Sequence, residues 1–185
     1  ALAYLILHQQ DSVGFVTFDN HVRKFIKPSG QPSHLKQLVH ALSDDTAREK
    51  TNLAPIFHDL ADRIGRKSII FVISDLFDEP DNILNGLRHL RHKRHEVIVQ
   101  HILDSAELDF PFQESTLFRG LEQEPEILTD PRSLREGYLN EINGFIKDLE
   151  QGCRSQNIDY VQMRTDTNLG VGLSTYLAKR QLRSR

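Results

Sequence analysis

Two carboxylates follow a short apolar run near the middle of the sequence and are its clearest candidates for chemistry. Asp75 comes directly after residues 69–74, which are apolar except for the last, and Asp78 follows three positions later. Open α/β sheets bind their ligands at the carboxyl ends of their strands, which is where Asp75 would stand. We therefore predict that Asp75 is the main functional residue. A solvated strand end or a helix-capping aspartate is the structural alternative.

The same two carboxylates allow an enzymatic interpretation. Haloacid-dehalogenase-type phosphatases have an apolar strand followed by Asp-x-Asp, in which the first aspartate is the nucleophile. Here the order is Asp-Leu-Phe-Asp, so the second carboxylate is displaced and the expected Thr or Val is absent. A Mg²⁺-dependent phosphohydrolase with Asp75 as its nucleophile stays as the alternative function, but we expect that the chain is not an enzyme.

Histidines supply the other candidates. His89, His92 and His95 recur at three-residue spacing, which could place them on one helix face as metal ligands. Arginine and lysine side chains surround them and would repel a cation, so we predict a solvated, positively charged helix end. The His58–Asp59 pair resembles the metal-binding pair of an all-helical class of phosphohydrolases. Because this chain has many strands, we expect the pair to be exposed, and Cys153 to be a packing residue.

Strands and helices alternate around Asp75. Residues 68–74 lack polar alternation and predict a central strand of a parallel sheet, buried on both faces. Helices are predicted on either side of it, over residues 53–64 and about 82–92, and another from Asp130 to about Cys153. The pattern predicts an α/β fold with a doubly wound, mostly parallel sheet and one antiparallel edge strand over residues 22–26.

Length and composition limit the class of protein. We expect residues 1–185 to form one domain, with an inserted extended or hairpin segment at about residues 105–130. A formal net charge of -3 argues against a general nucleic-acid-binding protein. One cysteine allows no intrachain disulfide, and no apolar run approaches the roughly 20 residues of a membrane span, so we expect a cytoplasmic protein. The first eight residues read as the second half of a helix, so we also expect a fragment.

The order of these motifs resembles that of a von Willebrand factor type A domain. More narrowly, the chain is similar to a family of uncharacterised bacterial proteins encoded beside MoxR-type AAA+ ATPases. The similarity extends over nearly the whole chain. It is carried by residues 1–5, 11–19, 51–53, 73–78, 109–112, 130–131, 158–161 and 177–180.

The resemblance implies a site and a function. Type A domains hold a divalent cation, commonly Mg²⁺, at a metal-ion-dependent adhesion site, in which Thr51 and Asp75 would be two of the ligands here. The DxSxS segment of that site is absent from the chain, so we expect no cofactor in this chain, and Mg²⁺ only in an intact parent protein. The resemblance implies a non-catalytic protein-interaction module that works with a MoxR-type ATPase or its client in the assembly or maturation of other proteins.

The resemblance also implies that the first central strand of the sheet is missing. That strand would lie between the strands at residues 13–18 and 68–74. Without it, we expect these two strands to face each other across a gap of roughly 10 Å, which is two strand spacings.

Overall fold

A three-stranded parallel sheet forms the centre of the molecule. The computed structural model describes residues 1–43, 53–119 and 126–183. Strands β3 (Ile69–Ser74), β4 (Glu96–Leu103) and β7 (Asp159–Arg164) are hydrogen-bonded in the order β3-β4-β7. Val72 lies opposite Val99, which in turn lies opposite Tyr160. Nearly every residue of β4 is buried because it has a strand on each side.

A separate hairpin stands beside this sheet. Strand β1 (Val13–Phe18) pairs with β2 (Val22–Ser29) in antiparallel register. The turn between them is fixed by Asp19, whose fully buried carboxylate receives a 2.6 Å bond from Arg23. Burial disfavours the charge on Asp19, yet the bonds from Arg23 and His21 hold its pKa below the ordinary value. A buried ion pair between Asp19 and Arg23 therefore holds this turn.

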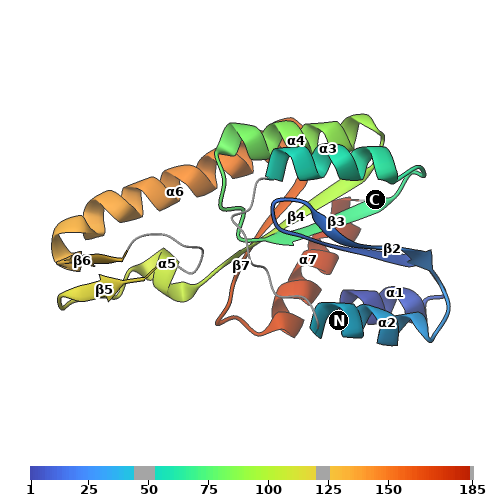
Figure 1. Ribbon diagram of the computed structural model, residues 1–185, viewed down its shortest axis with the longest axis horizontal. Helices are drawn as coiled ribbons and strands as arrows, with labels where there is room; N and C mark the ends of the chain where they lie inside the picture. Colours follow the sequence, from blue (N-terminus) through green and yellow to red (C-terminus); the bar gives the residue numbers. More distant parts are fainter. Residues whose placement is uncertain (44–52, 120–125, 184–185) are drawn as a thin grey trace.

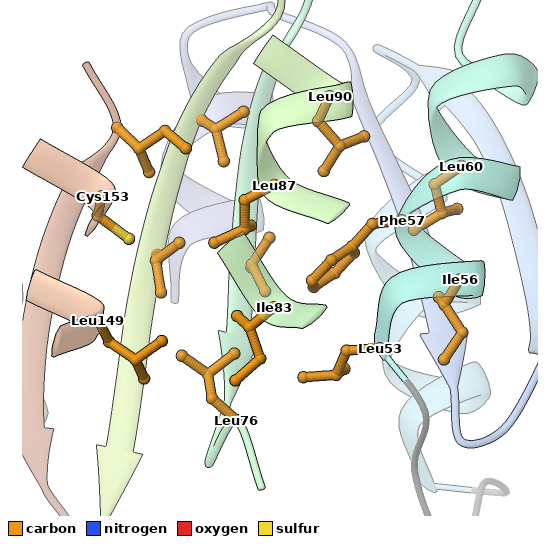
Figure 2. Close-up of a cluster of buried hydrophobic side chains, with 14 of the residues drawn as sticks. Leu53, Ile56, Phe57, Leu60, Leu76, Ile83, Leu87, Leu90, Leu149 and Cys153 are labelled. Carbon is orange, nitrogen blue, oxygen red and sulfur yellow. The ribbon is translucent and has the colours of Figure 1, made fainter. Parts of the chain in front are cut away.

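Helices cover both faces of the strands (Figure 1). Helices α3 (Leu53–Arg63), α4 (Pro80–His92) and α6 (Pro131–Ser155) lie on one face, the upper one in the figure. On the other face lie α1 (Leu2–His8), α2 (His34–Ser43) and α7 (Leu169–Arg183). The main apolar core forms where α4 packs between α3 and α6 (Figure 2). Fifteen buried residues make up this core, and they include Leu53, Phe57, Leu76, Ile83, Leu87, Leu149 and Cys153.

Cys153 confirms the prediction of a packing residue. Its side chain is 1% exposed and lies in this core. Burial raises the pKa of its thiol to about 12, so the reactive thiolate does not form near neutral pH.

An arm extends from the sheet beyond the carboxyl end of β4 (Figure 1). It contains α5 (Ser105–Asp109) and the antiparallel pair of β5 (Thr116–Phe118) and β6 (Ile127–Thr129). Phe110 holds it together, because its ring lies 5.9 Å from that of Phe118 and 4.5 Å from that of Tyr138 on α6. The predicted hairpin in this inserted segment is confirmed, and so is the helix start at Asp130, whose side chain accepts a bond from Arg132 N–H.

The α/β class, the parallel sheet and the antiparallel hairpin are confirmed, but one continuous sheet is not observed. Among the described strands, β1 pairs with β2 alone and β3 with β4 alone, so β3 is an edge strand. Consequently the predicted burial of residues 68–74 on both faces is wrong at Ile69 and Ile73, which are 54% and 56% exposed. Whether a further strand belongs between β1 and β3 stays a prediction.

The predicted solvated histidine row is wrong for His95. Helix α4 ends at His92, and Arg94 adopts a left-handed conformation with φ of 67°. That turn carries His95 inward, where it is 1% exposed and its Nδ1 accepts a bond from Ser68 N–H. His92 stays exposed, as predicted.

Candidate functional site

The loop between β3 and α4 presents two side chains to solvent on a tightly folded backbone. Asp75 is exposed at the carboxyl end of β3, as the sequence predicted, and Phe77 is 74% exposed. Between them, Leu76 is completely buried and has a positive φ of 55°. Left-handed backbone is costly for a leucine, and burial of its side chain in the core offsets that cost. Asp78 N–H closes the turn with a 2.8 Å bond to the Leu76 carbonyl.

Asp78 fastens the loop to two helices. Its Oδ2 accepts a 2.9 Å bond from Leu53 N–H at the start of α3. Its Oδ1 accepts a 2.7 Å bond from Glu79 N–H and a 3.4 Å bond from Asn82 Nδ2, both at the start of α4. A carboxylate is favoured there, because the first N–H groups of a helix lack partners and carry partial positive charge. The second carboxylate of the motif therefore holds the loop in place.

His101 anchors the other end of the loop from inside the sheet. This side chain is fully buried on β4, and its Nε2 lies 2.8 Å from the Asp75 carbonyl oxygen. A carbonyl can only accept, so Nε2 carries the proton and Nδ1 accepts the 2.6 Å bond from the Tyr160 hydroxyl. Burial lowers the pKa of His101, which keeps the imidazole neutral and preserves this arrangement, although the bond to Asp75 opposes the shift.

The neighbouring strand ends are occupied by contacts within the chain. Asp104, after β4, accepts bonds from Thr165 at 2.6 Å and from Ala106 N–H at 2.8 Å. These bonds lower the pKa of its carboxyl group. Arg164, at the end of β7, makes a bidentate bond to Asp109 at 3.1 and 2.7 Å. Asp75, by comparison, receives one long bond of 3.3 Å from the hydroxyl of Ser74.

The predicted metal site at Thr51 and Asp75 stays a prediction. Thr51 lies outside those residues, so its place relative to Asp75 is not described. Within residues 1–43, 53–119 and 126–183, no three His, Cys, Asp or Glu side chains lie close enough to hold a metal ion. Both oxygens of Asp78 are engaged by backbone N–H groups. The described residues alone therefore do not supply the oxygen-rich set that Mg²⁺ requires.

Sequence reasoning missed two residues of this site. His101 is a polar residue in an otherwise apolar strand, which is a usable signal, because a buried imidazole needs partners. Phe77 gave no such signal, since nothing local distinguishes an exposed aromatic residue from a buried one. The capping role of Asp78 matches the structural alternative that was considered for Asp75.

Comparisons with known proteins give a family and a fold. The family model described as a protein of unknown function, DUF58, matches residues 1–143. A search of curated proteins finds no match to this chain.

Two solved structures resemble the chain over most of its length. The first is the conserved hypothetical protein BatB from Bacteroides thetaiotaomicron, with a TM-score of 0.57 and 15% identity over 100% of this chain and 87% of that one. The second is an aerotolerance-related membrane protein from Bacteroides fragilis carrying multiple mutations to serine. It has a TM-score of 0.51 and 16% identity over 88% of this chain and 80% of that one. At such identity the likeness shows the fold alone. No described helix of the present chain is long and apolar enough to cross a membrane.

Proposed function

We propose, from the premise that this chain belongs to the DUF58 family of proteins of unknown function, that it is a non-catalytic protein-interaction module. Its partner is a MoxR-type AAA+ ATPase or the client protein of that ATPase. The loop between β3 and α4 makes the contact, with Asp75 and Phe77 as the binding residues.

One observation carries this proposal: a loop held at both ends exposes a carboxylate and an aromatic ring two residues apart. His101 and Asp78 fix the loop at both ends, so little conformational entropy is lost when a partner binds. Aromatic side chains supply much of the energy in protein interfaces, and a neighbouring charge gives specificity. Phe77 is more exposed than any other large apolar side chain in the described part of the chain.

The class of partner rests on the resemblance to type A domains, whose ligands bind at the same end of the sheet. The structural likeness to BatB supports the fold that this comparison requires. Asp75 is the residue that would meet a partner, because it alone of Asp75, Asp78 and Asp104 receives no bond from a backbone N–H group among the described contacts.

The phosphohydrolase alternative receives less support from the loop. Such an enzyme would use a second carboxylate beside the nucleophile, and Asp78 is committed to the starts of α3 and α4. Phe77, between the two aspartates, faces solvent. A binding role for Asp75 requires neither a general base nor a second carboxylate.

A binding measurement with matched controls tests the proposal. A MoxR-type ATPase from the same organism would be immobilised and titrated with the parent protein and with its Asp75→Ala and Phe77→Ala variants. Each substitution should weaken binding by at least about tenfold, the usual cost of losing a central interface residue. Asp148→Ala on α6 and Leu128→Ala on β6 remove an exposed charge and an exposed apolar side chain elsewhere, and should leave binding unchanged.

Two results would overturn the proposal. One is that both loop variants bind the ATPase as tightly as the parent protein and the two control variants do. The other is turnover of para-nitrophenyl phosphate with Mg²⁺ that is abolished by Asp75→Asn, which would establish the hydrolase instead.

A further inference from the structure

We propose that the seam between α3 and α4 binds a doubly charged tetrahedral oxyanion, such as the phosphate group of a small soluble molecule. The site is a shallow hollow on the outer surface of the helix pair, and none of its lining residues belongs to the β3–α4 loop. It is lined by His58 of α3 and by Asn85, Arg88, His89 and His92 of α4.

Close helix packing creates the hollow. A Cβ atom on Gly86 would lie 2.7 Å from Cδ2 of Phe57, so only glycine lets α4 approach α3 this closely. Phe57 itself is fully buried beneath the seam. One residue after Phe57 and three residues after Gly86, two histidines meet: the rings of His58 and His89 lie 4.4 Å apart, tilted by 53°. The sequence singled out both histidines but could not show that they face each other.

The lining of the hollow suits an anion. Each of the five side chains can donate a hydrogen bond: three imidazoles, one guanidinium and one amide. No carboxylate is among the five lining residues. Of the two acids nearby on α3, Asp62 lies close enough to interact electrostatically with His58 and His89, but its carboxylate is paired first with Lys93. Asp59 accepts a 2.8 Å bond from Arg63, and Asp62 lies 3.0 Å from Lys93 Nζ. Guanidinium and imidazolium groups make short, charge-assisted bonds to phosphate oxygens.

Charge decides between an anion and a metal ion. Arg88 is permanently positive, and Arg91 on the same helix adds to the field, so a cation is repelled. The carbonyl end of α4 favours positive charge, so the side chains must supply the attraction for an anion. Histidines gain charge as the pH falls from 8 to 6. A dianion seated in the hollow beside the contacting rings of His58 and His89 would offset the positive charge that Arg88 brings to the same surface.

The test follows histidine resonances in the full chain by NMR. Sodium sulfate is the first probe, because its charge is constant between pH 6 and 8, and inorganic phosphate is the second; sodium chloride matches the ionic strength. At pH 6 the ring signals of His58 and His89 should shift and saturate, with an affinity at least about tenfold higher than at pH 8. Arg88→Ala and His58→Ala should each abolish saturation, while His40→Gln on α2 should change nothing.

Three results would overturn the site. One is a shift that does not saturate or that appears equally at the exposed His8 and His40. Another is saturation that persists in Arg88→Ala or His58→Ala. The last is saturation by micromolar Zn²⁺ at pH 8 without any response to sulfate or phosphate, which would make the hollow a metal site. None of these measurements involves Asp75 or the ATPase.

Discussion

Replacing Asp78 by alanine should destabilise the protein measurably, because one side chain accepts backbone hydrogen bonds at the starts of two helices. The substitution leaves Leu53 N–H and Glu79 N–H without their acceptors, at 2.9 and 2.7 Å respectively. A hydrogen bond within a folded protein contributes typically about 1 kcal/mol. Loss of these two bonds therefore lowers the free energy of unfolding by about 2 kcal/mol. For a chain of this length that corresponds to a fall of about 4–8 °C in the melting temperature.

The Asp78→Asn variant shows whether both carboxylate oxygens of Asp78 contribute to stability. Asparagine retains one carbonyl oxygen and so can accept at one helix but not at both, which predicts a loss of about 1 kcal/mol. Urea unfolding followed by circular dichroism measures both variants. Asp148→Ala, an exposed aspartate on α6, should stay within about 0.5 kcal/mol of the parent. If Asp78→Ala also stays within that range, the loop is not held by these bonds and the rigidity argument for Asp75 fails with it.

Two further predictions concern the core. Burial lowers the pKa of His101. Below about pH 6.5 the imidazole therefore takes up a proton in the unfolded chain but not in the folded chain. The free energy of unfolding should consequently decrease as the pH is lowered. In His101→Gln the free energy of unfolding, measured with urea at a series of pH values, should decrease less steeply as the pH is lowered. Equal slopes for the parent and the variant would show that His101 is not the group responsible. Gly86→Ala should cost about 1–3 kcal/mol by overpacking Phe57. Gly137→Ala on α6 meets no atom within 4 Å and should instead stabilise by up to about 1 kcal/mol, so equal effects would refute the packing argument.

Local pattern sufficed to predict the helices that flank the site. Helix α3 is predicted by apolar residues on one face, and Leu53, Phe57 and Leu60 are indeed buried. Capping chemistry likewise identified Asp130 as the start of α6. These features depend on residues within one or two turns of each other, which is why a single sequence reveals them.

Features that depend on distant segments were not predictable. Ile69 and Ile73 belong to an apolar run that looks buried on both faces, yet their exposure is decided by which strands flank β3. His95 continued a three-residue repeat in the sequence. However, α4 ends at His92, and the left-handed conformation of Arg94 turns the side chain of His95 into the protein. The pairing of His58 with His89 needed the close approach at Gly86, which no local pattern indicates.

The spacing of Asp75 and Asp78 determines what each can do. Leu76 turns into the core between them and forces Phe77 outward, so the two carboxylates leave the backbone in different settings. Asp78 returns to the helix starts, where N–H groups neutralise it, and Asp75 keeps its carboxylate in solvent. In an Asp-x-Asp pattern only one residue separates the two aspartates. That residue could not both bury its side chain in the core, as Leu76 does, and place the second aspartate beside the starts of the two helices, as Phe77 does. The extra residue thus lets the second carboxylate bond to the two helix starts and support the loop that displays the first.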